Sequence, residues 1–334
     1  MTNPVLVEAL RGTRVESRHR GAIAMADADG TIALELGEVE QPIYARSAIK
    51  ALQALLLIET GAADRFYLAD AELALACASH GGEPPHVAGV ERMLGRIDLD
   101  PSALECGAHF PIHQGSAHAL VRAGRSPSAV HNNCSGKHAG FLACCRAMEV
   151  DHRGYLSPAH PVQREVKAAI ENLAGLSIAD DCCAIDGCSV PTWALPLRNL
   201  AKAFARFGTG QGLAAGRAAA AGRLRAACVA NPFLIAGTGR FCTQVMEALG
   251  SRVFVKSGAE GMQCAALPEL GLGIALKCDD GAARAAEVVM AWALGRLMRD
   301  DAARAALSPF MRPELHNWNG TVVGRLCPAA GSGH

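Results

Sequence analysis

Ser47 and Lys50 stand three residues apart at the start of an almost wholly apolar stretch, and this spacing permits chemistry. In a helix, side chains three positions apart lie on one face and can touch. The chain continues from Lys50 as ALQALLLI, so we expect this helix and its lysine to be buried. A neutral buried amine can accept the proton of a serine hydroxyl and so make the serine a nucleophile. The alternative is that Ser47 caps the helix while Lys50 points into solvent.

A second lysine could support this chemistry. The stretch VFVKSGAEG places Lys256 at the end of an expected strand, before Ser257 and Gly258. Desolvation and a nearby cation both favour a neutral lysine amine, so Lys256 facing Lys50 would help the proton transfer. Serine acyl-transfer enzymes of the penicillin-recognising class combine S-x-x-K on a helix with K-[ST]-G on a strand. Ser79, in ACASHGGEP, is our candidate for the third hydroxyl of that class, and a serine in an ordinary turn is the alternative.

Two cysteine-containing stretches could bind a metal. HNNCSGKHAG contains Cys134 and Lys137, and AIDGCSVP contains Asp186 and Cys188. Cysteine and histidine are the usual ligands of zinc, and close spacing lets side chains of one turn converge. No complete four-ligand cysteine and histidine pattern is present, however. The spacing by itself therefore favours small buried thiols over a zinc site.

The elements that must position these residues fall into three blocks. The first forty residues predict strands, with a hairpin turn at DADG. Strand signals then vanish for about two hundred residues, in which six segments have helical spacing. Those segments begin SAIKALQALLLIETG, PPHVAGVERMLGRI, KHAGFLACCRAM, PVQREVKAAIENLAG, LPLRNLAKAFARF and GRAAAAGRLRAACV. Strands return at RVFVKSG, MQCAALPEL and LGIALKCDDG, and ARAAEVVMAWALGRLMRDD predicts a last helix.

Neither terminal block can form a stable sheet by itself, because a lone hairpin or meander buries too little surface. We therefore predict one antiparallel sheet built from both ends of the chain and flanked by helices. Residues 1–45 and 246–334 would form this sheet domain, and residues 46–245 would form an inserted helical domain. The active site would lie at their junction. The final AAGSGH is expected to be a loose tail.

The composition narrows the possible functions. The chain has 334 residues, with 32 basic and 32 acidic side chains, so its formal net charge is zero. This balance does not indicate binding to nucleic acid or to an anionic membrane. We find no secretory signal and no stretch apolar enough to span a bilayer. The 13 cysteines include two vicinal pairs, which are poor disulfide candidates. Many free thiols without an export signal predict a cytoplasmic protein.

Taken together, ARSAIKALQ, SHGGE, HNNCSGKHAGFL, IDGCSVP and KSGAEG resemble the asparaginase II family, the class 3 or Rhizobium etli-type L-asparaginases. The resemblance extends over nearly the whole chain, and HNNCSGKH with DGC is far more specific than S-x-x-K. It implies a mixed α/β (α+β) fold of the serine β-lactamase and glutaminase-like type. It also implies a homodimer and the hydrolysis of L-asparagine to L-aspartate and ammonia.

The resemblance also implies roles for individual residues. Ser47 resembles the nucleophile, Lys50 its base, and Ser79 with Lys256 a second serine–lysine pair. The implied zinc ligands, which replace the interpretation as plain buried thiols, are Cys134, Lys137 and Cys188. Our candidates for substrate binding are Arg46, Lys137, Asp186 and Gly258. A lysine that binds zinc must be neutral.

Three rival functions stay open at the level of sequence. The same nucleophile could act on glutamine or a β-lactam. A zinc-bound hydroxide could instead attack the amide, with Ser47 as a structural residue. The protein could also be a zinc-stabilised sensor that binds amides without turnover.

Overall fold

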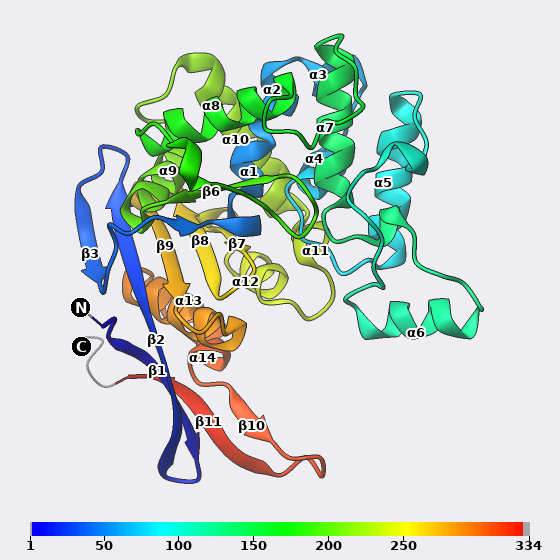
Figure 1. Cartoon of the computed structure of the whole chain (residues 1–334). Helices are drawn as coiled ribbons and strands as arrows, with labels where there is room; N and C mark the ends of the chain where they lie inside the picture. Colours follow the sequence, from blue (N-terminus) through cyan, green and yellow to red (C-terminus); the bar gives the residue numbers. More distant parts are fainter. Residues whose placement is uncertain (1, 330–334) are drawn as a thin grey trace.

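The computed structural model describes residues 2–329, and its centre is an antiparallel sheet made from both ends of the chain (Figure 1). The strand order is β10-β11-β1-β2-β9-β8-β7, and β3 pairs with β2 on the side. The strands of this sheet are β1 (Val5–Arg11), β2 (Arg14–Asp27), β3 (Ile32–Leu36), β7 (Phe254–Ser257), β8 (Met262–Leu267), β9 (Leu272–Cys278), β10 (Glu314–His316) and β11 (Val322–Pro328). The predicted sheet from both termini is therefore confirmed.

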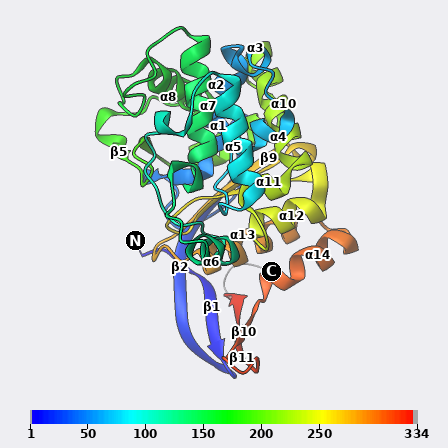
Figure 2. The same ribbon diagram turned by 90° about the vertical axis from the view of Figure 1, so that its right-hand side faces the viewer.

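The hairpin of β2 and β3 shows why the first block folds as expected. Asp27 Oδ1 accepts hydrogen bonds from the N–H groups of Asp29, Gly30 and Thr31, each at 2.9 Å. This carboxylate therefore closes the turn, as short polar side chains commonly do. Beyond the hairpin, β1, β2, β10 and β11 extend as a ribbon away from the body of the molecule (Figures 1 and 2).

Helices cover both faces of the middle of the sheet, which explains why β8 is buried along its whole length. Helix α9 (Leu197–Thr209) contacts β2, β8 and β9, and α13 (Ala283–Leu297) contacts β1, β8, β9 and β11. Figure 1 shows α9 on one side and α13 with α14 (Asp301–Met311) on the other. Because α9 comes from the stretch predicted as the helical domain, the two predicted domains share one core.

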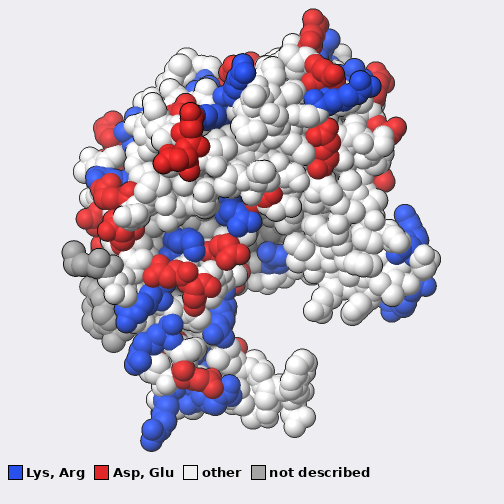
Figure 3. All heavy atoms as spheres, viewed as in Figure 1, with Lys and Arg blue, Asp and Glu red and all other residues white. Residues whose placement is uncertain are grey.

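The remaining helices stack beside the sheet, and all six predicted helical segments contain helix. They are α1 (Lys50–Gln53), α2 (Leu55–Glu59), α3 (Ala62–Arg65), α4 (Asp70–Ala76), α5 (Pro84–Arg96), α6 (Gln114–Arg122), α7 (Ser135–Ala147), α8 (Pro161–Ala174), α10 (Ala215–Ala230), α11 (Pro232–Ala236) and α12 (Phe241–Leu249). No helix in the described part of the chain is long and apolar enough to cross a membrane. On the face shown in Figure 3, acidic and basic side chains are interspersed.

Three expectations about the elements need correction. The expected single helix after Ser47 is a 3-10 turn, Arg46–Ile49, followed by the short helices α1 and α2. The expected absence of strands in the middle of the chain is wrong, because β4 (Ile43–Tyr44), β5 (Cys183–Ile185) and β6 (Pro191–Leu195) form a small sheet. These strands are too short to produce a clear alternating pattern. The last predicted helix is followed by α14, β10 and β11, and the predicted tail at 330–334 lies outside the described residues.

Candidate active site

Ser47 lies in a tight turn that is held against the end of the large sheet. Arg46, just before it, has φ +50°, a left-handed conformation that is uncommon for a residue other than glycine. Gly258, just after β7, packs on this turn, and a Cβ at Gly258 would lie 3.0 Å from both Ala45 O and Ala48 N. Glycine at position 258 therefore allows the sheet edge to approach the turn that carries Ser47.

Ser47 and Gly258 line a pocket of about 230 Å³ that also includes Ser79 and Lys256. Its other lining residues are Asn133, Ala236, Arg240, Phe241, Cys242, Ser257, Ala259, Glu260 and Ala283. The pocket thus lies where the end of β7 meets loops and helix ends from the middle of the chain. It brings together three of the four predicted catalytic residues.

Two buried lysines meet at the hydroxyl of Ser79. The Ser79 Oγ accepts hydrogen bonds from Lys50 Nζ at 3.0 Å and from Lys256 Nζ at 2.8 Å. Lys50 also donates to Ala78 O at 2.6 Å, and Lys256 donates to Ser257 O at 2.7 Å. The two lysine residues are 0% and 1% exposed, so water cannot solvate their charges. The Lys50 backbone N–H donates to Ser47 O, but within residues 2–329 no hydrogen bond joins the Ser47 hydroxyl to the Lys50 amine, whose hydroxyl partner is Ser79.

This arrangement makes one of the two amines easy to deprotonate. Burial lowers the pKa of Lys256 from an ordinary 10.5 to about 7, and the neighbouring Lys50 ammonium lowers it further. A serine hydroxyl carries no charge that could offset two buried cations. Near neutral pH, Lys256 can therefore both accept and donate a proton.

A second cluster places sulfur opposite lysine. Cys134 lies at the start of α7, and Lys137 lies one turn further along that helix, while Cys188 follows β5. Lys137 Nζ lies 3.1 Å from Cys188 Sγ, and Lys50 Nζ lies 3.1 Å from Cys134 Sγ. Lys50 therefore contacts both clusters. All these side chains are buried.

The two thiols and the two lysines affect one another's protonation. A hydrogen bond between the thiols lowers the pKa of Cys134, assisted by Lys50 and Lys137, and raises the pKa of Cys188. Burial opposes a charged Lys137, but the one negative charge that the coupled Cys188 and Cys134 sulfurs share outweighs it and raises the pKa of Lys137. The cluster therefore holds a thiolate beside an ammonium.

These residues fit a zinc ion only if the lysine nitrogen takes part. No group of three or more His, Cys, Asp or Glu side chains in the described part of the chain could hold a metal. Cys134 and Cys188 supply two sulfur donors, and Lys137 Nζ supplies a nitrogen within the same buried cluster. Three protein donors with a fourth open position are typical of zinc sites that bind a substrate or water. The donor set thus fits the ion that the family resemblance implies.

Arg46 and Asp186 connect this cluster to the turn of Ser47. Arg46 Nε donates to Asp186 Oδ1 at 2.7 Å, and the Gly187 N–H donates to the same oxygen at 2.8 Å. Burial opposes a charged Asp186, but Lys137, Gly187 and Arg46 outweigh it and lower the pKa of Asp186. The pair is half-buried and lies between the predicted catalytic and metal residues.

Several pocket residues were missed by the sequence analysis. Asn133 lies directly before Cys134 in the HNNCSGKHAG stretch, so its position in the sequence could have predicted that it lies near the site. Glu260 lies in KSGAEG, which was also noted, whereas Arg240 and Cys242 belong to no recognised pattern and only long-range packing brings them to Ser47. All 13 cysteines are free thiols, as the vicinal pairs suggested.

Comparisons with solved structures give weak likenesses. The native form of Mglu is 17% identical, with a TM-score of 0.46 over 90% of this chain and 70% of that one. A beta-lactamase from Mycobacterium bovis is 16% identical, with a TM-score of 0.41 over 87% and 94% of the two chains. Simvastatin synthase (LovD) from Aspergillus terreus is 11% identical, with a TM-score of 0.43 over 87% and 90%.

Sequence comparison with families is decisive, whereas none of the curated proteins matches the chain. The model of the family described as L-asparaginase II matches residues 7–328, which is nearly the whole chain. That match agrees with the motifs around Ser47, Cys134 and Lys256 and with a sheet built from both termini. The chain therefore belongs to the L-asparaginase II family, whose members are hydrolases that act on amides.

Proposed function

We propose that this protein hydrolyses L-asparagine to L-aspartate and ammonia through a serine acyl-enzyme, with zinc beside the substrate pocket. The observation that carries the proposal is the pair of buried lysines on Ser79 Oγ, in a small pocket that Ser47 also lines. Family membership supports an amide as the substrate. The pocket volume of about 230 Å³ suits an amino acid better than a polymer.

In the first step, Ser47 Oγ attacks the carbon of the side-chain amide while Lys50, in the form of the site in which its amine is neutral, accepts the hydroxyl proton. The carbonyl oxygen then becomes an oxyanion, which needs N–H donors. The Ser47 N–H donates no hydrogen bond within residues 2–329, so it is free for this purpose. The N–H of Gly258 already donates to Met262 O at 2.7 Å, so a second donor must come from a neighbour of Gly258.

Collapse of the tetrahedral intermediate breaks the bond between carbon and nitrogen. Ser79, held between Lys50 and Lys256, can deliver the proton with which the nitrogen leaves as ammonia. A water molecule then attacks the aspartyl ester, its proton returns to the lysines, and Ser47 is released. Each residue thus ends in its starting protonation state.

The buried sulfur cluster would serve binding. Cys134, Lys137 and Cys188 would hold the zinc ion, which when bound supplies a Lewis acid for the charged end of the substrate. Asp186 and Arg46 border the same region and would help to orient that end. Lys137 must release its proton to become a ligand, so zinc should bind more tightly as the pH rises.

The test is ammonia release from L-asparagine, L-glutamine and a β-lactam in parallel, with native enzyme and with chelator-treated enzyme. We expect turnover of L-asparagine to be fastest and to survive chelation with a raised KM. Loss of all turnover on chelation would favour zinc-bound hydroxide as the attacking group. Binding of L-asparagine without ammonia release would identify a sensor in place of an enzyme.

A further inference from the structure

Arg240 is a second cation of the pocket, and the mechanism above gives it no task. It lies at the start of α12 and lines the same pocket as Ser47 and Ser79. We propose that the Arg240 guanidinium binds the α-carboxylate of the amino-acid substrate and so determines specificity. This inference rests on the proposed function, because it concerns the substrate of that same site.

The Arg240 side chain is half-buried and available for a ligand. Its guanidinium makes no hydrogen bond or ion pair with the residues that the structure describes. Its long-range electrostatic partners are Lys256 and Glu287, and burial raises the pKa of that glutamate. Arg46 differs, because Asp186 already accepts its Nε–H at 2.7 Å. A planar guanidinium without a partner suits two-point recognition of a carboxylate.

The size of the pocket places a substrate within reach of both residues. A ligand that fills about 230 Å³ beside Ser47 must also approach Arg240, because both line this space. Phe241 and Cys242, the first residues of α12, line it as well. The start of a helix carries partial positive charge and adds to the attraction of Arg240 for an anion.

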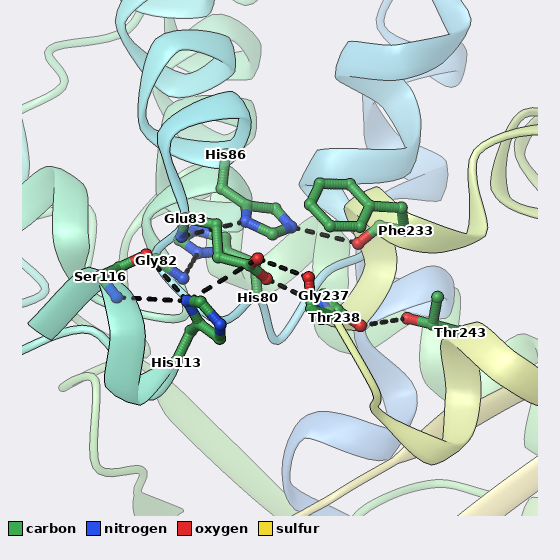
Figure 4. Close-up of polar contacts among 10 residues, drawn as sticks. All are labelled: His80, Gly82, Glu83, His86, His113, Ser116, Phe233, Gly237, Thr238 and Thr243. Atoms are coloured by element: carbon green, nitrogen blue, oxygen red, sulfur yellow. Dashed lines mark hydrogen bonds and ion pairs between the residues drawn. The ribbon is translucent and has the colours of Figure 1, made fainter.

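A network of hydrogen bonds fixes the loop that carries Arg240 (Figure 4). Glu83, which is 6% exposed, accepts from Thr238 N at 2.9 Å and from Thr238 Oγ1 at 2.6 Å. Thr243 Oγ1 donates to Gly237 O at 2.9 Å, and Arg240 N donates to the same oxygen at 3.3 Å. Gly237 has φ +111°, and a Cβ there would lie 2.4 Å from Glu83 Oε1.

The same network reaches Ser79. The Ser79 N–H donates to Ile235 O at 2.9 Å, directly before the loop of Arg240. His86 Nε2 lies 3.1 Å from Phe233 O, and its ring stacks on both Phe233 and His80. Ser79 and Arg240 are therefore held in a fixed relation, and such preorganisation reduces the cost of binding.

The zinc cluster and Arg240 can share the charged end of the substrate. The α-carbon of L-asparagine carries an amino group and a carboxylate. Once deprotonated, the amino nitrogen would be a ligand for a zinc ion held by Cys134, Lys137 and Cys188, and Asp186 lies beside that cluster. The carboxylate still needs a cation, and among the pocket-lining residues the free one near Ser47 is Arg240.

The experiment compares L-asparagine with β-alaninamide, which is L-asparagine without its α-carboxylate. Arg240→Met should lower kcat/KM for L-asparagine about 10- to 100-fold, since a hydrogen-bonded charge is lost. It should change kcat/KM for β-alaninamide less than about twofold. Arg240→Lys should give a kcat/KM for L-asparagine between those of the native enzyme and Arg240→Met. Lysine keeps the positive charge but lacks the paired N–H donors of a guanidinium. Arg65→Met, which removes an exposed arginine on α3, is the matched control and should alter neither value.

The loop network gives a second variant that tests the same idea. Thr238→Val removes the hydroxyl that donates to Glu83 and should give a smaller loss, again confined to L-asparagine. If Arg240→Met lowered kcat/KM for L-asparagine and for β-alaninamide by the same factor, the inference would be overturned. It would also be overturned if Arg240→Met left both values of kcat/KM unchanged. Titration of succinate into Ser47→Ala, with and without Arg240→Met, measures binding separately from turnover. If the native enzyme hydrolyses no amide yet succinate binding depends on Arg240, the proposed function fails and this inference survives.

Discussion

Lys50 lies between two clusters of buried side chains, each of which contains a lysine. The two clusters differ in the atoms that contact the lysine amines. In the oxygen cluster, Lys50 and Lys256 both donate to the neutral hydroxyl of Ser79. In the sulfur cluster, Lys137 Nζ lies 3.1 Å from Cys188 Sγ, and the negative charge of Cys134 also attracts the Lys137 ammonium. Burial is nearly complete in both. The difference in partner therefore decides how each lysine holds its proton.

The outcome is opposite in the two clusters. Burial and a second cation lower the pKa of Lys256 to about 7, whereas the negative charge on the Cys134 and Cys188 sulfur pair raises the pKa of Lys137 above its ordinary value. A lysine that exchanges protons near neutrality suits acid–base catalysis. A lysine paired with thiolates is a structural counter-ion, or a metal ligand once its proton is displaced. The comparison predicts that the oxygen cluster carries the chemistry and the sulfur cluster the binding.

The largest expected effect comes from Ser47→Ala. Removing the attacking oxygen should lower kcat roughly 10⁴-fold or more, while the fold and the metal content stay as in the native protein. Intact-mass analysis with a slow substrate analogue should place the covalent adduct on Ser47 in the native enzyme. Near-normal turnover by the alanine variant would favour zinc-bound hydroxide as the attacking group and would contradict the assignment of catalysis to the oxygen cluster.

Lys50→Arg is expected to have the next largest effect. Arginine keeps the positive charge but cannot give up its proton in a protein, so kcat should fall about 10²- to 10⁴-fold. Zinc content should fall less than kcat, because Lys50 contacts Cys134 but is not among the proposed ligands. An active Lys50→Arg enzyme with an unchanged pH profile would show that Lys50 is only a buried cation between the clusters.

Much of this site could be predicted from local sequence. Ser47 and Lys50 share a short apolar stretch, and the absence of polar neighbours was enough to predict a buried lysine. Lys256 at a strand end followed from β-branched and aromatic residues before it and glycine after it. The hairpin turn at Asp27 was readable for a similar reason, since its hydrogen bonds span only four residues.

The rest depended on contacts between distant parts of the chain. Lys256 and Ser79 are 177 positions apart, so no local pattern could show that both lysines meet at Ser79. Arg240 has no motif, and its place in the pocket depends on Glu83, which is 155 positions from Thr238. The 3-10 turn at Ser47 packs against Gly258, a contact between distant parts of the chain that local sequence could not show.

Cys188→Ala tests whether the sulfur cluster serves binding. It should remove most of the bound zinc and raise KM for L-asparagine about tenfold, with a smaller change in kcat. Metal analysis of the purified variant and steady-state kinetics measure the two quantities. Cys144→Ala, which removes a buried thiol on α7 outside the cluster, should leave both as in the native enzyme. A native protein that holds no zinc would leave the sulfur cluster as a purely structural thiolate–ammonium pair.

The smallest expected effect is on stability, in Lys256→Met. The pKa of Lys256 is about 7 in the folded protein against an ordinary 10.5, so the unfolded chain binds the extra proton between these values. Folding therefore loses stability as the pH falls from about 10.5 to about 7, and the full loss remains below pH 7. Methionine carries no charge, so the variant should gain in unfolding temperature relative to native enzyme at pH 6, and the gain should shrink by pH 10. Lys202→Met on α9 supplies the control for general effects of removing a lysine. A difference in unfolding temperature that stays constant from pH 6 to 10 would mean that Lys256 keeps an ordinary protonation state, and the contrast with Lys137 would vanish.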